Sequence, residues 1–177
     1  TFCATNISRD GEFFFIMKTM PLDYRKVISA KVVFCFVVSF VSVSTSVAVI
    51  GGTGFITPIQ SLYVWAVTVA VSFAQICFAT RKDFNHPRFN KEGDGEVRES
   101  NTTVSVLILL GLAVSFLIGF IALYSGMYLK LQRGEAYGEL VSMTSVAAIA
   151  VVLVVASVFY LVKGLDKKYY ELSEANL

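Results

Sequence analysis

The stretch VVFCFVVSFVSVSTSVAVI, residues 32–50, contains no charged side chain and decides the fold class of this chain. A transmembrane helix needs roughly 20 apolar residues to cross a hydrocarbon core of about 30 Å. Valine-rich runs also occur in buried strands, but this run is longer than such strands usually are. A helix satisfies its own backbone hydrogen bonds, which lipid cannot do. The stretch therefore predicts a membrane-spanning helix.

Three further runs of the same kind follow along the 177 residues. They cover residues 62–80, 103–129 and 140–162, and none of them contains Asp, Glu, Lys, Arg or His. Only 16% of the chain is charged, whereas a soluble domain carries about a quarter. We therefore expect an all-α, polytopic helical membrane protein with four transmembrane helices. Two short loops, 51–61 and 130–139, are expected on one side of the membrane.

The distribution of Lys and Arg predicts the orientation. Thirteen of the 15 basic residues lie before the first run, between the second and third, or after the fourth. Basic residues concentrate on the cytoplasmic side of membrane proteins. We therefore expect a multi-pass protein of the cell membrane with both termini inside. The expected organisation is a cytoplasmic segment 1–31, a transmembrane domain 32–163 with a cytoplasmic loop 81–102, and a cytoplasmic tail 164–177.

The segment before the first run has its own pattern. Phe13, Ile16, Met17 and Met20 follow the i, i+3, i+4, i+7 spacing of one helix face. Pro21 would break such a helix and is well suited to start another. This pattern predicts a short amphipathic cytoplasmic helix, a turn, and a restart towards the first span. Such a helix could be a simple membrane anchor or a docking element for a cytoplasmic partner.

Two stretches carry a resemblance to a known family. The first is NISRDGEFFFIMKTMPLDYRKVISAKVV, residues 6–33, and the second is RKDFNHPRFNKEGDGEVRESNTTVSVL, residues 81–107. Their order and spacing resemble those of permease subunits of ATP-binding-cassette exporters, in the type-2 permease group. The matching residues are Ser8, Arg9, Gly11, Phe13, Lys18, Pro21, Arg25, Lys26 and Lys31 in the first stretch, and Asp83, Pro87, Arg88, Phe89 and Asn90 in the second. Asp10 departs from the family, which more often has glutamate there.

The resemblance implies a function and its partners. It implies the C-terminal part of a permease that a separate cytoplasmic ATPase subunit drives, working with a second permease copy or with upstream helices of the same permease in the lipid bilayer. The implied coupling segment, which would contact the ATPase, consists of Met20, Pro21, Leu22, Asp23, Tyr24, Arg25 and Lys26. The chain itself is not expected to be an enzyme, since it has no G-x-x-x-x-G-K-[ST] motif.

Small residues in the runs predict helix packing. Gly111, Ser115 and Gly119 form two small-x-x-x-small steps, which let another helix approach closely. This stripe is equally compatible with a non-catalytic four-helix scaffold or accessory subunit of a larger membrane complex. Ser39, Ser42 and Ser46 could line a polar path, but bonds to their own helix are the favoured interpretation. No catalytic, cofactor or metal site is predicted, and no nucleic-acid partner is expected.

Overall fold

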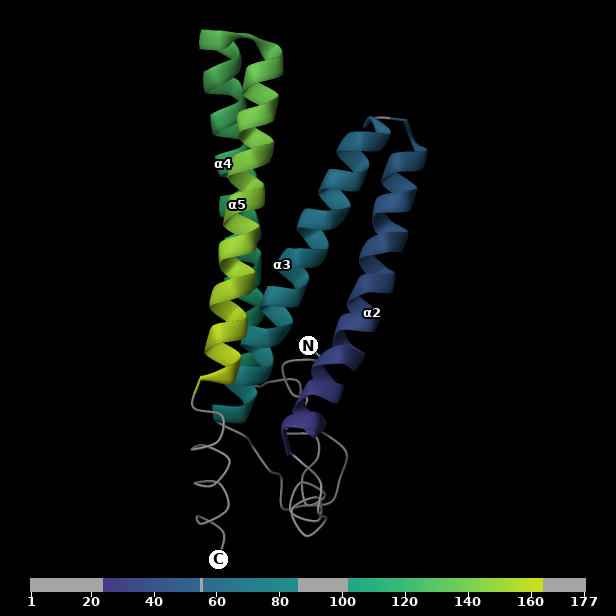
Figure 1. Cartoon of the computed structure of the whole chain (residues 1–177), viewed down its shortest axis with the longest axis vertical. Coiled ribbons are helices and arrows are strands. Elements are labelled where there is room, and N and C mark those ends of the chain that lie inside the picture. Colours follow the sequence, from purple (N-terminus) through teal and green to yellow (C-terminus); the bar gives the residue numbers. More distant parts are fainter. Residues whose placement is uncertain (1–23, 55, 86–101, 164–177) are drawn as a thin grey trace, which may run out of the picture.

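The computed structural model describes residues 24–54, 56–85 and 102–163, where all the regular secondary structure is helical (Figure 1). The helices are α2 (Tyr24–Gly52), α3 (Pro58–Asn85), α4 (Thr102–Arg133) and α5 (Glu135–Val162). All four are long and apolar enough to cross a membrane. The prediction of an all-α, four-helix membrane protein is therefore confirmed. The predicted amphipathic helix and the tail 164–177 lie outside the described residues.

Each helix extends beyond the apolar run that predicted it. The expected loop 130–139 is wrong: α4 and α5 meet with only Gly134 between them, and its φ of +98° lies in a region that suits glycine. The connection between α2 and α3 is also short. Thr57 and Gln60 cap the start of α3 reciprocally, because each backbone N–H donates to the other's side chain, at 3.1 and 3.3 Å. Pro58 takes the first helical position, where its missing N–H costs nothing.

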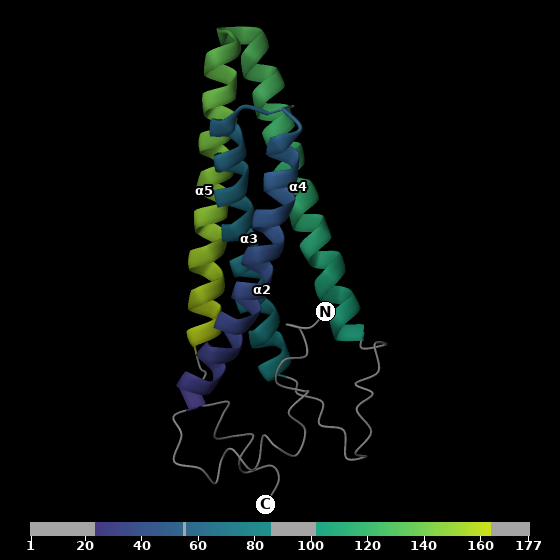
Figure 2. The ribbon, with the colours of Figure 1, turned by 90° about the vertical axis from the view of Figure 1, so that its right-hand side faces the viewer.

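The helices form two antiparallel hairpins, α2–α3 and α4–α5. The extensive contacts are between α2 and α3, between α3 and α5, and between α4 and α5. The basal end of the bundle is where α2 and α4 begin and α3 and α5 end; the turn end carries the two short connections. Figure 1 shows the α2–α3 hairpin leaning away from α4–α5 towards the turn end, and Figure 2 shows α4 diverging from α5 towards the basal end.

Aromatic side chains hold the α2–α3 hairpin together. Phe36 meets Phe73 edge-on with ring centroids 5.3 Å apart, and Phe40 meets Trp65 in the same way at 5.6 Å. The Trp65 indole N–H donates to the Ser44 hydroxyl at 3.0 Å. Nearer the basal end lies a buried cluster formed by Val32, Cys35, Ile76 and Cys77. The hairpin is therefore packed along its length rather than joined only at its turn.

The α4–α5 hairpin is closest near its turn. Gly138 lies directly against the α4 backbone: a Cβ built there would be 2.9 Å from the Gly126 carbonyl oxygen. The Ser142 hydroxyl donates to the Ala122 carbonyl at 2.9 Å, which links the helices one turn further along. Only glycine permits so short a distance, because any side chain would collide with backbone atoms. This seam fixes α4 to α5 at the turn end.

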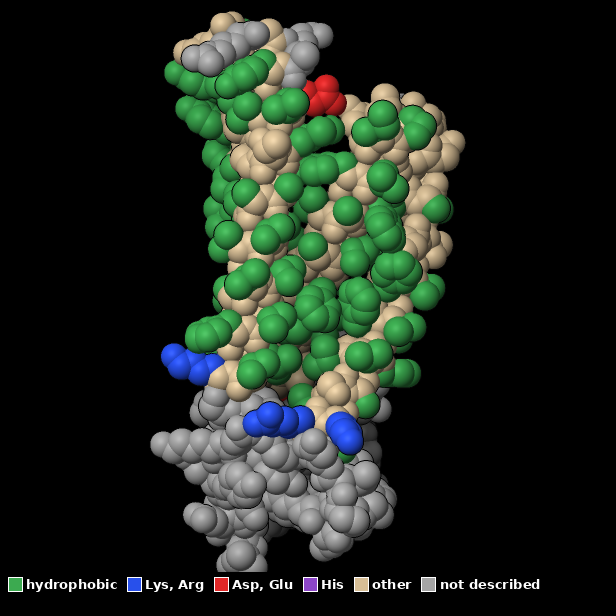
Figure 3. All heavy atoms as spheres, in the orientation of Figure 1, with side chains coloured by type: hydrophobic (Ala, Val, Ile, Leu, Met, Phe, Trp, Pro, Cys, Tyr) green, Lys and Arg blue, Asp and Glu red, His purple; other side chains and the backbone are tan. Residues whose placement is uncertain are grey.

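The outer surface of the bundle is strongly apolar. Hydrophobic side chains cover the middle of the face in Figure 3, while the Lys and Arg side chains seen there lie at the basal end. Along α4 the exposed side chains include Phe116, Leu123 and Met127. Such a surface would be unfavourable in water and is suited to contact with a lipid bilayer.

Candidate functional site: an apolar groove between α3, α4 and α5

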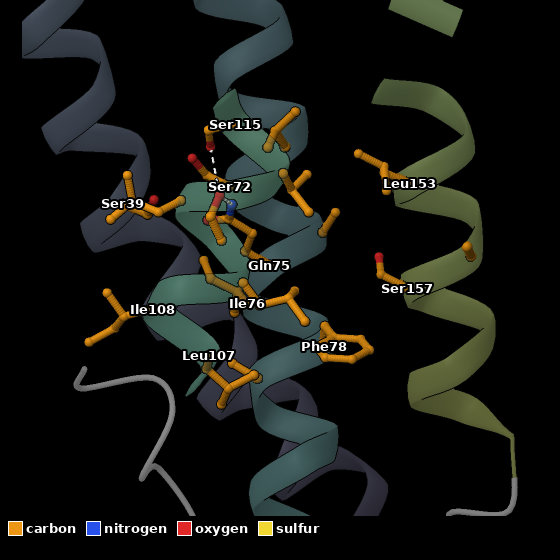
Figure 4. A pocket seen from close by; sticks show the side chains of 18 of the residues that line it. Ser39, Ser72, Gln75, Ile76, Phe78, Leu107, Ile108, Ser115, Leu153 and Ser157 are labelled. Atoms are coloured by element: carbon orange, nitrogen blue, oxygen red, sulfur yellow. Dashed lines mark hydrogen bonds between the residues drawn. The ribbon is translucent and has the colours of Figure 1, made fainter. Parts of the chain in front are cut away.

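A groove of about 780 Å³ opens between the two hairpins in the half of the bundle nearer the basal end. Its walls come from the stretch 71–79 of α3, the stretch 107–115 of α4 and the last turns of α5, and Ser39 of α2 contributes to the far side. Figure 4 shows Leu153 and Ser157 projecting from α5 towards α3, where Phe78 lies, while Leu107 and Ile108 come from the α4 side of the groove. The groove exists because α4 is fixed to α5 at the turn end and diverges from α5 towards the basal end.

Most of the groove lining is apolar, with a few polar side chains among it. The polar lining residues are Ser39, Ser72, Gln75, Ser115, Ser157 and Tyr160. Two of these hydroxyls are already used within their own helices: Ser115 donates to Gly111 O, and Ser157 donates to Val154 O, both at 2.9 Å. Ser46 of α2 similarly donates to Ser42 O. The favoured interpretation of the α2 serines therefore holds for Ser46, whereas Ser39 lines the groove.

Gln75 is the amide that faces this groove. Its Nε2 lies 3.5 Å from the Gly111 carbonyl oxygen, at the long limit of a hydrogen bond, and its side chain is exposed. A glutamine amide has two donor hydrogens and an oxygen that can accept two bonds. Most of this capacity is directed into an apolar groove, where a polar group on a ligand or another helix would gain a strong contact.

Contacts between α3 and α5 lie at the turn end of the bundle and within the basal part of the groove lining. At the turn end, Gln60 donates to Glu139, and the Tyr63 hydroxyl donates to Met143 O. At the basal end, the Phe78 and Tyr160 rings stack with centroids 5.2 Å apart. The groove is therefore a local opening rather than a general separation of the hairpins.

The structure separates the three residues of the predicted packing stripe. Gly111 and Ser115 line the groove, and Gly111 contacts Gln75. Gly119 is exposed, and no described atom lies within 4 Å of a Cβ built on it. Within the described part of the chain, Gly111 thus approaches a side chain of α3 and Gly119 approaches nothing. The packing role of the whole stripe stays a prediction.

The close helix contact lies elsewhere, at residues that the sequence reasoning missed. Gly126 and Gly138 form the seam between α4 and α5. The signal was present, because residues 122 and 126 and residues 138 and 142 each form a small-x-x-x-small step. The step at residues 138 and 142 begins inside the expected loop 130–139, so the sequence did not predict a helix face there.

The predicted coupling segment is mostly outside the described residues. Met20, Pro21, Leu22 and Asp23 are not described, and Tyr24 is the first residue of α2. Arg25 and Lys26 are exposed at the basal end of α2. Its role therefore stays a prediction.

Two charged residues of the expected loop 81–102 are in fact buried within a helix. Arg81 and Asp83 belong to the last turns of α3, with 8% and 4% of their surfaces exposed. The sequence reasoning assigned them to a loop because charge was taken to mark the end of the span. A helix can continue past the hydrocarbon core, and its charged residues can then be covered by neighbouring helices.

No protein-family model matches the chain, and no curated protein or solved structure is significantly similar to it.

Proposed function

We propose that this chain is the transmembrane permease component of an ATP-driven exporter, and that the groove between α3, α4 and α5 forms part of the path of its substrate. The groove is the observation that carries the proposal. It combines an apolar lining with a few polar groups inside a bundle of membrane-spanning helices, and binding sites for small molecules commonly have this composition.

The pattern of helix contacts supports a moving part. α3 and α4 meet through the long hydrogen bond from Gln75 to Gly111, while α4 lies directly against the backbone of α5 near Gly126 and Gly138. The basal half of α4 could therefore tilt about this seam without disturbing the buried cluster between α2 and α3. Such a tilt would widen or close the groove, which is what alternating access requires of a permease.

The power source in this proposal is a separate ATPase subunit. The resemblance of residues 6–33 and 81–107 to type-2 exporter permeases supports it, and the coupling segment from Met20 to Lys26 would receive the motion. In the described part of this segment, Arg25 and Lys26 are exposed at the basal end. This end is the expected cytoplasmic side, where an ATPase could contact them.

Cross-linking across the groove tests the proposal. Gln75→Cys combined with Gly111→Cys places two thiols on opposite sides of the α3–α4 contact, where a short bis-thiol reagent can join them. We expect the link to reduce ATP hydrolysis by the co-purified ATPase subunit at least tenfold in vesicles, and reduction of a cleavable reagent to restore it. The native Cys35 and Cys77 are buried and therefore react slowly.

The matched control links α4 to α5 at the seam, where the two helices stay together during the proposed motion. Gly126→Cys with Ser142→Cys puts two β-carbons about 3.6 Å apart in the α4–α5 seam, a separation that suits a disulfide. This link should leave ATP hydrolysis within about twofold of the unlinked protein. Full activity with the α3–α4 link in place would refute the role of the groove.

The coupling segment needs its own test. Exchanging Met20, Pro21 and Leu22 for glycine and serine in the complete complex should uncouple ATP hydrolysis from transport. Unchanged transport-coupled hydrolysis would show that the segment does not transmit the motion.

A second candidate is an accessory subunit of a larger membrane complex. The exposure of α4 favours it, because no residue of this helix between Ser105 and Gln132 is buried, and Gly119 has open space around it among the described atoms. A partner helix could cover this face. Purification distinguishes the two candidates: co-isolation with a nucleotide-hydrolysing subunit supports the permease, and a stable complex that lacks one supports the accessory subunit.

A further inference from the structure

Arg81 occupies an unusual position at the basal end of α3. Only 8% of the surface of this residue is exposed. Its Nη2 donates to the Lys163 carbonyl oxygen at 2.8 Å, next to the last residue of α5. The centre of the guanidinium lies 6.0 Å from the Tyr160 ring centroid and 5.9 Å from that of Phe84. The charge is therefore held between the ends of two helices and two aromatic rings.

Among the described residues, much of the guanidinium lacks a hydrogen-bond partner. Nε and Nη1 are buried, and neither has a hydrogen-bond partner among the described residues. These two nitrogens carry three of the five N–H donors of an arginine side chain. The adjacent Thr80 is fully buried, and its hydroxyl also has no hydrogen-bond partner within the described part of the chain. Buried polar groups are normally paired, and an unpaired buried charge is strongly unfavourable.

The contacts that Arg81 makes satisfy only part of the hydrogen-bonding capacity of its charged guanidinium. The bond to Lys163 O caps the negative end of the α5 dipole, for which a single donor suffices. Aromatic rings attract the cation through their faces but accept no in-plane hydrogen bonds from Nε or Nη1. A group with several acceptor oxygens and a negative charge would complete the site.

The position of Arg81 near the end of a membrane-spanning helix indicates which kind of anion would bind there. Arg81 lies four residues before the end of α3, about 6 Å along the axis at 1.5 Å per residue. The same end of the bundle carries exposed Lys and Arg side chains, including Arg25, Lys26 and Lys163. The phosphate groups of a bilayer lie at the ends of membrane-spanning helices, and basic sites between such helices bind anionic headgroups.

We propose that Arg81 is the centre of an anion site that binds a phosphate group at headgroup depth, with Nε and Nη1 as its donors. Arginine forms short, charge-assisted hydrogen bonds with phosphate oxygens. An anionic phospholipid is the expected source, and free phosphate is the other source with the same chemistry. By binding at the contact between α3 and α5, the anion would stabilise the closed basal end of the bundle.

The experiment measures lipid binding to the full chain in nanodiscs. Thermal unfolding is followed in phosphatidylcholine alone and with increasing phosphatidylglycerol, and native mass spectrometry counts the retained lipids. We expect phosphatidylglycerol to raise the melting temperature of the wild type. Arg81→Gln should weaken phosphatidylglycerol binding at least about tenfold, because it removes charge-assisted hydrogen bonds.

Lys82→Gln is the matched control. It removes the same charge from the next residue of α3, whose side chain is half-buried, and it should leave the binding within about twofold. Equal phosphatidylglycerol binding by the wild type and Arg81→Gln, together with no Arg81-dependent stabilisation by inorganic phosphate, would overturn the proposal. An equal loss in Lys82→Gln would also overturn it, because the effect would then be one of overall charge.

Two further measurements use the Arg81→Lys variant and inorganic phosphate. If Arg81→Gln does not fold, Arg81→Lys keeps the charge while replacing the guanidinium, and it should bind about tenfold more weakly; unchanged binding would overturn the assignment of Nε and Nη1. Inorganic phosphate added to the protein in lipid-free detergent separates the two sources. An Arg81-dependent stabilisation by phosphate, with none by phosphatidylglycerol, would support the oxyanion site and assign it to soluble phosphate.

Discussion

Gly138→Ala provides the sharpest test of the structure, because a single methyl group would collide with the neighbouring helix. A Cβ at this position would lie 2.7 Å from the Lys130 backbone nitrogen and 2.9 Å from the Gly126 carbonyl oxygen. Both atoms belong to the α4 backbone, so no side-chain rotation can relieve the contact. The α4 and α5 helices would have to separate at the point where they are most tightly joined.

The size of the effect follows from these distances. Ordinary contact begins at 3.4 Å, so α4 must move away by about 0.7 Å, the difference between 3.4 and 2.7 Å. Overpacking of this kind costs about 1–3 kcal/mol. Alanine also favours a helix over glycine by up to about 1 kcal/mol, which offsets part of the loss. We therefore expect the free energy of unfolding to fall by about 1–2 kcal/mol.

The assay is reversible unfolding in detergent micelles, with two glycines of the neighbouring helix α4 as controls. Gly119→Ala adds a methyl group where no described atom lies within 4 Å, and it should leave stability unchanged or raise it by up to about 1 kcal/mol. Gly126→Ala places its methyl group 3.6 Å from Ser142 Cβ, an ordinary contact, and should be tolerated. Both variants gain the same helix propensity, so the difference between their free energies of unfolding reports the collision at Gly138 alone. A difference near zero would refute the packing of the α4–α5 seam.

Three other substitutions test separate features by the same unfolding measurement. Gly134→Ala forces a side chain into the positive φ of the one-residue turn and should lower the free energy of unfolding by about 1–2 kcal/mol; full stability would mean that the turn has another conformation. Thr80→Val replaces a buried hydroxyl that lacks a partner in the described region with an apolar group of the same shape, so in lipid-free detergent it should be neutral or stabilising by about 1 kcal/mol. A clear loss would reveal a partner for that hydroxyl. Trp65→Phe removes the donor to Ser44 and should lower the free energy of unfolding by about 1 kcal/mol, with no further loss from Ser44→Ala. Additive losses would show that the two side chains act independently.

The four helices could be predicted because the signal for a membrane span is local. An uncharged run such as 32–50 needs only its own residues to identify it, since the thickness of the bilayer sets the length. The ends of the helices were less predictable. Lys130 and Arg81 are both helical, although their charge marked the edge of an apolar run, because a helix does not stop where the hydrocarbon core stops.

The candidate site could not be predicted in the same way. The helices are apolar on nearly all sides, so their periodicity does not show which face meets another helix. Gly111 and Gly138 each begin a small-x-x-x-small step in the sequence, but one lines an open groove and the other lies against a backbone. The sequence alone therefore determined that the chain is a bundle of four membrane-spanning helices, through the local balance of apolar and charged residues. Only the tertiary structure decided where the helices touch, where the groove opens and that Arg81 is buried, because these depend on how residues far apart in the chain come together.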